Sequence, residues 1–506
     1  MGLHDFSFYD LINRNAIAFG SNICWHEVDD GRRVTFDDYK IRVDSLANGL
    51  SRIGIKKGDR IGVMGKNSLE YFLVYGAAAV LGAIILPINW RLSADEVCYN
   101  LNDCQPKVAF VDLEFQSLLE ERRDELPSIE SYYNLRSDNG EALPFSSLMD
   151  GTENIVPADV KSADGFVIIH TAAVAGRPRG ALLSHGNMVS ANTEFNYCMK
   201  LTAGDVHLNL LPLFHVGGLF LASSTFQAGA VNLNVSKFEA KGAAKLIQEH
   251  GASVLFDFPP ILDSILTAAK EAQYNLASLK AVVGLGTKDV IEEYQALTGG
   301  RYYALYGQTE TSCVATLGKY SDRPGSAGKA VMLADIRLVD DHDRSVGIGD
   351  VGEITVKGPL VFQGYWGLPE DNAYTFREGW HHTGDLGRFD ENGFLFYAGR
   401  KAEKELIKPG GENVYPAEVE KVILQHEAVA QTVVIGVPDP KWKEGIKAIC
   451  QLHAGKTVTS AELIGFVGER IARFKKPQYV EFVNELPLKT DGSPDREAVK
   501  SLYGSG

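Results

Sequence analysis

The sequence has few cysteines, and they form no recognisable motif. Only six occur among 506 residues, scattered from Cys24 to Cys450 without a C-x-x-C pair. That pattern fits neither a disulfide framework nor a zinc-ligand spacing. We therefore interpret them as reduced core thiols in a cytoplasmic protein.

Membrane-spanning and targeting segments are also lacking. The longest uncharged apolar run, residues 72–88, is short for a membrane span and is interrupted by two glycines and Pro87. It predicts a buried helix that leads into a strand. The first 19 residues contain no cationic-then-apolar run, and Gly2 lacks the downstream Ser or Thr of a myristoylation signal. We expect no signal peptide and no membrane insertion.

An excess of positive charge is the third feature that is missing. The chain has 50 basic and 65 acidic residues, for a net charge of −15. This balance argues against a general binder of nucleic-acid backbones, so an anionic ligand needs a local site. The length exceeds that of one typical core and predicts two or more domains.

The first 400 residues alternate between predicted helices and strands. Residues 35–54 predict a helix capped by Thr35, and strands are expected at 60–64, 107–112, 167–170, 253–256 and 281–283. This alternation indicates layered α/β subdomains. From about Ile336, short segments separated by Asp and Gly turns predict a small β subdomain.

The last hundred residues predict a second, smaller domain. Residues 401–408 are dense in charge and resemble a linker. Strands are expected at 433–437, 446–452 and 479–483, with a helix at 461–474. We predict an α+β domain over residues 409–506.

One glycine-rich string follows the strand at 167–170. Residues 170–180 read HTAAVAGRPRG, in which Gly176 and Gly180 permit a tight turn while Arg177 and Arg179 add charge. Residues 182–187 then predict the start of a helix. The string lacks a Walker A pattern, and alone it is more typical of a structural turn than of a nucleotide site.

A second string, YGQTE at residues 306–310, follows a predicted strand at 302–305. Tyr306 could stack on a base, Gly307 could let a ligand approach the backbone, Thr309 offers a hydroxyl to phosphate, and Glu310 could hold Mg²⁺. A packed tyrosine and a solvated glutamate explain the string equally well when it stands alone.

A third string, WHHTGDL, spans residues 380–386. Asp385 follows a glycine, which predicts a turn where a carboxylate can accept hydrogen bonds from vicinal hydroxyls such as those of ribose. A capped turn is the alternative. His381 and His382 point to opposite sides of a strand and lack nearby ligands, so we expect no metal there.

The fourth string joins Arg400 to a loop at residues 405–419 that contains Gly410 and Gly411. It places a fixed cation at a domain boundary, beside a loop thin enough for a narrow ligand chain to pass. A flexible linker turn is the alternative.

Taken in this order, the four strings resemble those of the adenylate-forming superfamily, which includes acyl-CoA synthetases, luciferases and peptide-synthetase adenylation domains. The resemblance runs from Thr35 to Arg496 and includes GDR at 58–60, LPLFHV at 211–216, GPLVFQGYW at 358–366 and VPDP at 437–440. It implies an AMP-binding domain over 1–400, a hinge at 401–408 and a mobile domain over 409–506.

The resemblance also assigns roles to residues. Tyr306 would stack on adenine, Thr309 would contact the α-phosphate, Glu310 would bind Mg²⁺, and Asp385 with Arg400 would hold the ribose. Further nucleotide contacts are assigned to Thr171, Gly176, Gly180, Gly286, Thr287, Gly307 and Gln308. The acid would lie near Phe214, His215, Val216 and Gly284, and coenzyme A (CoA) would pass Gly410 and Gly411.

The implied reaction is acyl-CoA formation from a carboxylic acid, ATP and CoA. A carboxylate is a poor electrophile, so its oxygen first displaces pyrophosphate from ATP, and the thiol then attacks the acyl-AMP. Charge grows on the α-phosphate, which requires cations and Mg²⁺. Rotation of the small domain would open the acyl-AMP to the thiol.

Two positions depart from the family pattern. The loop at 171–180 lacks several of the usual hydroxyl residues, and Arg179 replaces a lysine. Ser493 stands where a catalytic lysine is expected, so Lys489 or Arg179 supplies the charge or adenylation is slow. We expect Ser493→Lys to accelerate acyl-AMP formation.

Three alternatives stay open: a weakened acyl- or nucleotide-binding relative, an enzyme that loads a carrier protein, and reverse operation that makes ATP. The acid cannot be identified from the sequence, although Phe214, Val216, Leu219, Phe256 and Leu285 predict an apolar pocket. A homo-oligomer also stays open.

Overall fold

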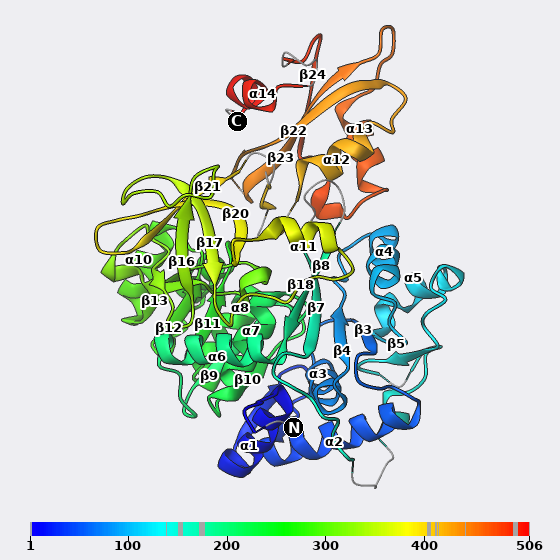
Figure 1. Cartoon of the computed structure of the whole chain (residues 1–506), viewed down its shortest axis with the longest axis vertical. Helices are drawn as coiled ribbons and strands as arrows, with labels where there is room; N and C mark the ends of the chain where they lie inside the picture. The colour runs from blue at the N-terminus through cyan, green and yellow to red at the C-terminus, as the bar shows by residue number, and fades with distance from the viewer. Residues whose placement is uncertain are drawn as a thin grey trace. The chain divides into compact units, whose positions relative to one another are not determined.

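The structure is a computed structural model that describes residues 3–137, 139–149, 155–171, 178–401, 406–409, 412, 414–440, 442–488 and 494–504. The chain divides into two compact units. Figure 1 labels the helices and strands named below. Unit 1 contains Met1–Trp90, Leu101–Ile169 and Gly180–Gly399, and unit 2 contains Arg91–Asn100, His170–Arg179 and Arg400–Gly506. Each unit is described by itself.

A nine-stranded sheet forms one half of unit 1, in the order β15-β14-β13-β12-β11-β9-β10-β1-β2. Six strands from β13 to β1 are parallel, and the strands at both edges are antiparallel. The strands are β1 (Ile23–Glu27), β2 (Arg33–Thr35), β9 (Val206–Asn209), β10 (Val231–Asn234), β11 (Val254–Asp257), β12 (Ala281–Gly284), β13 (Arg301–Tyr306), β14 (Thr316–Lys319) and β15 (Lys329–Ala330). The associated helices are α6 (His185–Met199), α7 (Val216–Gln227), α8 (Ala240–His250), α9 (Ile261–Ala272) and α10 (Lys288–Thr298).

A seven-stranded sheet has the order β18-β8-β7-β4-β3-β5-β6. Its strands are β3 (Arg60–Met64), β4 (Ile84–Pro87), β5 (Val108–Val111), β6 (Ser131–Asn134), β7 (Gly165–Thr171), β8 (Arg179–Ser184) and β18 (Gly364–Tyr365). The neighbouring helices in sequence are α1 (Phe8–Phe19), α2 (Phe36–Arg52), α3 (Leu69–Leu81), α4 (Ala94–Cys104) and α5 (Gln116–Glu120). The predicted α/β layers are confirmed.

Helix starts in this region follow the sequence closely. The Thr35 hydroxyl accepts a hydrogen bond from the Asp38 amide and caps α2, as predicted, and Ser68 caps α3 in the same way. Every residue of α3 is buried, and β4 follows it, which confirms the buried helix leading into a strand. Among the described residues, no helix is both long and apolar enough to cross a membrane.

The small β subdomain expected from Ile336 is a five-stranded sheet with the order β16-β17-β20-β19, in which β21 also pairs with β20. Its strands are β16 (Asp335–Val339), β17 (Gly352–Lys357), β19 (Phe376–Arg377), β20 (Trp380–Phe389) and β21 (Leu395–Arg400), with helix α11 (Pro369–Thr375) before β19. Asp385 lies within strand β20, so the predicted turn is wrong.

The carboxyl-terminal part of unit 2 has a three-stranded sheet, β22-β23-β24. It consists of β22 (Val429–Asp439), β23 (Lys443–Leu452) and β24 (Tyr479–Val483), with helices α12 (Pro416–Ile423), α13 (Ser460–Gly468) and α14 (Arg496–Tyr503). The predicted α+β character is confirmed. The helix expected at 461–474 ends earlier, at Gly468, and a short 3-10 turn follows at Arg473–Lys475.

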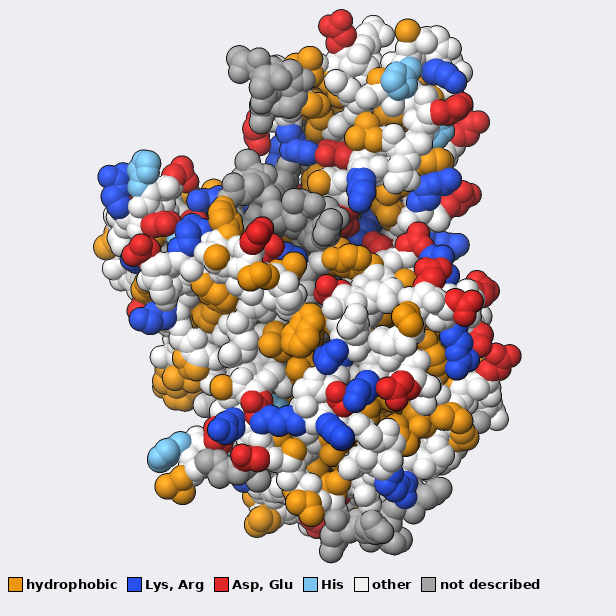
Figure 2. Space-filling model, turned by 45° about the vertical axis from the view of Figure 1, so that its right-hand side comes forward, with side chains coloured by type: hydrophobic (Ala, Val, Ile, Leu, Met, Phe, Trp, Pro, Cys, Tyr) orange, Lys and Arg blue, Asp and Glu red, His pale blue; other side chains and the backbone are white. Residues whose placement is uncertain are grey.

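The surface of the described residues carries both signs of charge. Figure 2 shows acidic and basic side chains interspersed on the face in view. This mixing agrees with the composition, in which acids outnumber bases without forming long runs.

Candidate functional site

Hydrogen bonds to Asp385 connect the second string, residues 306–310, to the third, residues 380–386. Tyr306, the last residue of β13, donates its hydroxyl to Asp385 Oδ2 at 2.9 Å. The Gln308 amide nitrogen donates to the same oxygen at 2.5 Å. Asp385 is only 3% exposed. Two strings about 80 residues apart in sequence therefore meet at one carboxylate.

Tyr306 is held mainly by apolar packing. Its ring belongs to a core cluster with Ala315, Leu338, Ile354, Val356 and Leu395. Burial, with the negative charge of Asp385 second, raises the pKa of the hydroxyl well above its ordinary value. The hydroxyl therefore stays protonated and acts as a donor. The ring of Tyr397, a residue to which the sequence assigned no role, stacks on Tyr306 at 6.3 Å.

Glu310 lies in a short 3-10 turn, Thr309–Thr311, directly after β13. Its carboxylate accepts a hydrogen bond from the Tyr365 hydroxyl at 2.9 Å, and its carbonyl accepts one from the Phe362 amide at 3.0 Å. A carboxylate is a ligand type that Mg²⁺ prefers. Glu310 thus fits the predicted metal role chemically, and Tyr365 is a contact that the sequence did not single out.

Several glycines of the predicted site are required by the chain's own packing. A Cβ on Gly307 would lie 2.1 Å from the Cys313 carbonyl oxygen, and one on Gly284 would lie 2.0 Å from the Asp257 carbonyl oxygen. The Gly286 amide donates to the Tyr302 hydroxyl at 2.5 Å. Close backbone contacts therefore explain Gly307 and Gly284 without a ligand. Thr287 is exposed at the start of α10.

Three of the four residues predicted to contact the acid, Phe214, His215 and Val216, lie at the start of α7, and the fourth, Gly284, ends β12. His215 caps this helix, and its Nδ1 accepts a hydrogen bond from the Gly217 amide at 3.3 Å. Its ring meets the edge of Phe258, which stacks on Phe256 at 5.3 Å. Phe214 contacts Trp90 edge-on. The two aromatic members of the predicted pocket, Phe214 and Phe256, therefore each pack against a further aromatic ring, Trp90 and Phe258 respectively.

The other members of the predicted pocket divide between core and surface. Val216, Leu219 and Phe256 belong to the main hydrophobic core of unit 1. Leu285 is 43% exposed. Their role in binding an acid stays a prediction.

The glycine-rich string is described only at its ends. Thr171 ends β7 and Arg179 begins β8, and the Thr171 hydroxyl donates to the Arg179 carbonyl at 3.4 Å. Strand β8 continues to Ser184, so the predicted helix start at residue 182 is wrong. The helix, α6, begins at His185. The Gly180 carbonyl accepts a hydrogen bond from the Trp366 amide at 2.7 Å.

Part of the predicted site lies outside the described residues. This applies to Gly176, Gly410, Gly411, Lys489 and Ser493. Arg400 is the last residue of β21 and belongs to unit 2, whereas the rest of the strand belongs to unit 1. The roles assigned to these residues stay predictions.

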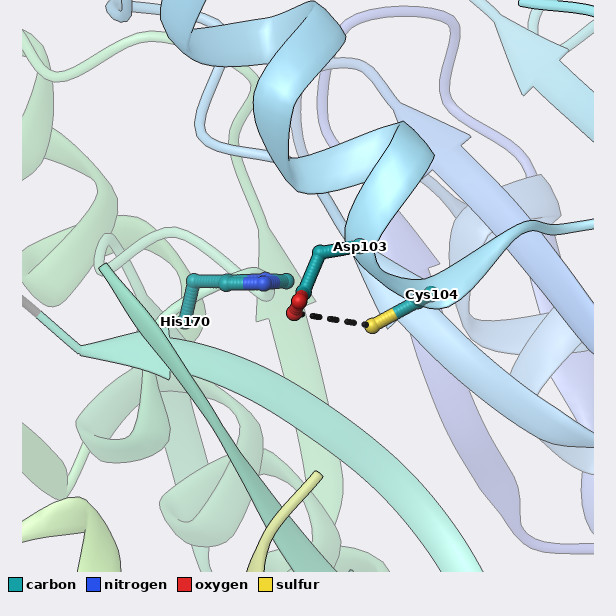
Figure 3. Close-up of side chains that lie close together, drawn as sticks. All are labelled: Asp103, Cys104 and His170. Atoms are coloured by element: carbon teal, nitrogen blue, oxygen red, sulfur yellow. Dashed lines mark hydrogen bonds between the residues drawn. The ribbon is translucent and has the colours of Figure 1, made fainter. Parts of the chain in front are cut away.

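The cysteines carry no sign of reactivity. None of the six, all of which the structure describes, forms a disulfide, and burial raises the pKa of Cys313 to about 12 and that of Cys198 and Cys450 to about 11. The Cys104 thiol donates to the Asp103 carboxylate at a sulfur–oxygen distance of 3.7 Å (Figure 3). A protonated thiol is a poor nucleophile, so Cys198, Cys313 and Cys450 are structural.

Comparison with known proteins gives matches along most of the chain. Residues 13–366 match the AMP-binding enzyme family, and residues 418–492 match the AMP-binding enzyme C-terminal domain. The chain is 32% identical over 469 residues to an indoleacetate–CoA ligase of Aromatoleum aromaticum, covering 91% of each protein. It is 30% identical over 487 residues to the fatty acid–[acyl-carrier-protein] ligase ScoC of Streptomyces coeruleorubidus, covering 94% of this chain and 92% of that protein.

Among solved structures, the chain resembles an o-succinylbenzoate CoA synthetase from Bacillus subtilis bound with its product analogue. The TM-score is 0.87, the identity is 26%, and 98% of each chain is covered.

Proposed function

The chain belongs to the AMP-binding enzyme family of adenylate-forming ligases, and from this premise we propose that it is an acyl-CoA ligase. It activates a carboxylic acid with ATP and transfers the acyl group to CoA. The single observation that best supports this proposal is the buried Asp385 carboxylate, which hydrogen bonds with Tyr306 and Gln308 hold in place.

In the first half-reaction, an acid oxygen attacks the α-phosphate of ATP and pyrophosphate leaves. Asp385 accepts hydrogen bonds from the ribose hydroxyls, and Thr309 donates its hydroxyl to the α-phosphate. Glu310 would hold Mg²⁺ through its carboxylate, which accepts a hydrogen bond from the Tyr365 hydroxyl. Mg²⁺, when bound, supplies positive charge against the charge that develops on the phosphates.

In the second half-reaction, the CoA thiol attacks the acyl carbonyl and AMP leaves. We propose that this step uses the carboxyl-terminal domain, residues 409–506, hinged at 401–408 to an AMP-binding domain over 1–400. Gly410 and Gly411 would border the CoA path. Arg400 would hold the ribose with Asp385, and Arg179 or Lys489 would supply the charge that Ser493 lacks.

The decisive experiment is a substrate panel. The purified chain is incubated with ATP, Mg²⁺, CoA and aliphatic, alicyclic or aromatic acids, and release of AMP and pyrophosphate is measured. We expect release that requires one class of acid and, for the thioester, CoA. Failure of every acid to increase AMP release would overturn the proposal and favour a binding protein.

A carrier protein is the second candidate acceptor, because one relative of 30% identity is an acyl-carrier-protein ligase. The same acid is offered with CoA or with a phosphopantetheinylated carrier protein. If a thioester forms with the carrier protein and not with CoA, the carrier protein would replace CoA as the acyl acceptor in the proposal. ATP formation from acyl-CoA, AMP and pyrophosphate measures the reverse direction.

We also propose a cytoplasmic location, which is supported by six cysteines that form no disulfide in the described part of the chain. Sedimentation of the purified chain measures whether it forms a homo-oligomer.

A further inference from the structure

Asp385 is unusual in how two donors converge on one of its oxygens. Oδ2 accepts hydrogen bonds from the Tyr306 hydroxyl at 2.9 Å and from the Gln308 amide at 2.5 Å. The backbone amide of Asp385 also donates to the Thr383 hydroxyl at 3.1 Å. The side chain and the backbone of this residue are therefore both held in place.

The orientation of the Gln308 amide is determined by its partners. Its Nε2 donates to Asp385 Oδ2 and also to the Thr383 carbonyl at 3.0 Å. Both partners are acceptors, so only the nitrogen end of the amide fits between them. Gln308 thereby fixes the loop after β13 to two points on β20.

A carboxylate that binds a vicinal diol must present its oxygens in a defined plane. Rotation about the side-chain torsions of the carboxylate costs little free energy unless other groups restrain it. Such a rotation moves the oxygens out of position and weakens their hydrogen bonds to a ligand. Donors that converge on one oxygen from a tyrosine and a glutamine supply that restraint at Asp385.

We propose that Gln308 and the Tyr306 hydroxyl are positioning residues that set how strongly the site discriminates nucleotides with ribose hydroxyls from nucleotides without them. This inference rests on the proposed function, in which Asp385 holds the ribose. It gives Tyr306 a hydroxyl role in addition to the predicted stacking of its ring.

The test compares ATP with 2′,3′-dideoxy-ATP, which lacks both ribose hydroxyls. Gln308→Met keeps the side-chain length but removes the donor, and Tyr306→Phe keeps the ring. Equilibrium affinity is measured by calorimetry, and kcat/KM by pyrophosphate release. We expect each variant to bind ATP about 5- to 10-fold more weakly, the scale of one typical net hydrogen bond, and to bind the dideoxy analogue within about twofold of wild type.

Tyr294→Phe is the matched control. The Tyr294 hydroxyl donates to the Leu279 carbonyl at 2.9 Å in a fully buried place, so this variant loses a comparable hydrogen bond. It should leave the ratio of the two affinities unchanged. Thermal unfolding of all variants shows whether they fold.

The outcomes separate the inference from the proposed function. If Gln308→Met and Tyr306→Phe weaken the binding of both nucleotides by the same factor, or weaken the binding of neither, the positioning role is overturned. If wild type binds ATP better than the analogue but forms no acyl-AMP, the proposed function fails. The inference is then still decided by whether the variants change the ratio of the affinities for ATP and for the analogue. If wild type does not prefer ATP to the analogue, the inference fails.

Discussion

Two buried carboxylates, Glu27 in the nine-stranded sheet and Asp385 in the five-stranded sheet, differ in where their hydrogen-bond donors come from. Glu27 on β1 accepts hydrogen bonds from the Trp25 indole, the Leu69 amide and the Asn234 amide side chain. These donors come from β1, the start of α3 and β10. Asp385 accepts from two residues of a single five-residue string. The donors to Glu27 come from three separate places in the chain, whereas the donors to Asp385 come from one short segment, residues 306–308, which they join to β20.

This difference separates a structural carboxylate from a candidate ligand-binding one. Burying a carboxylate is unfavourable unless hydrogen bonds compensate, so both residues need donors. When the donors come from three elements, loss of the carboxylate damages the fold. When they come from one short segment, loss of the carboxylate should mainly damage binding. Substitutions at the two positions test this contrast directly.

The largest effect is expected for Asp385→Asn. This variant keeps the shape and one acceptor oxygen but loses the charge that strengthens hydrogen bonds to both ribose hydroxyls. We expect kcat/KM for ATP to fall on the order of 100-fold, equivalent to about 3 kcal/mol. Pyrophosphate release measures it. A thermal midpoint far below that of wild type, with normal activity per folded molecule, would make Asp385 structural and remove the contrast.

Glu27→Ala should have the opposite profile. The substitution leaves three buried donors without their acceptor, and at least one stays unsatisfied, at a cost of about 2 kcal/mol in the free energy of unfolding. Denaturant unfolding measures the loss. The affinity of the remaining folded protein for ATP should equal that of wild type. Exposed Glu121 provides the control, since Glu121→Ala should change neither quantity.

Glu310 is an intermediate case, because its carboxylate accepts from Tyr365 on β18, which pairs with β8. Tyr365→Phe removes that donor and keeps the ring that packs against Phe362. We expect the Mg²⁺ concentration for half-maximal ATP binding to rise about fivefold, because a poorly oriented Glu310 carboxylate loses ~1 kcal/mol of binding free energy.

Calorimetric titration of ATP at several Mg²⁺ concentrations measures that effect. Tyr75→Phe, which removes a buried hydroxyl that donates to the Leu213 carbonyl, is the matched control. An unchanged Mg²⁺ dependence in Tyr365→Phe would show that this hydroxyl serves only the fold.

Much of the fold could be predicted because local signals and tertiary packing agree there. The Thr35 cap and the strand Arg60–Met64 are examples. Strand β8 was missed at residues 182–184, where one of its two neighbours, β18 at residues 364–365, lies about 180 residues away in the chain. Asp385 was expected in a turn because Gly384 precedes it. Gly384 does have a φ of 68°, but β20 accommodates it where the pairing register with β17 shifts.

The candidate site divides in the same way. Motif spacing singled out Tyr306, Gln308 and Asp385, but the hydrogen bonds that join them connect residues 77 and 79 positions apart. No local pattern encodes such a contact. Tyr365 was part of a family string without a role, since only the structure brings its hydroxyl to Glu310. Glu27 carries no motif at all.

The smallest expected effect concerns the pH dependence of stability. Burial, which outweighs its hydrogen bonds, raises the pKa of Glu27 above its usual value. The folded chain therefore holds this proton more tightly than the unfolded chain. Its contribution to the free energy of unfolding is fully present below the unfolded pKa, about 4.3, and is lost as pH rises through the folded pKa, by at most ~1.4 kcal/mol per pH unit.

Glu27→Gln removes this titration and keeps an oxygen acceptor. Thermal midpoints of wild type and variant, measured from pH 4 to pH 8, should therefore diverge, with wild type losing stability relative to the variant as pH rises. Glu121→Gln, at an exposed position, should run parallel to wild type. If Glu27→Gln also runs parallel, Glu27 titrates at its ordinary pKa. Its three donors would then compensate fully for burial, and the two carboxylates would differ only in where their donors originate.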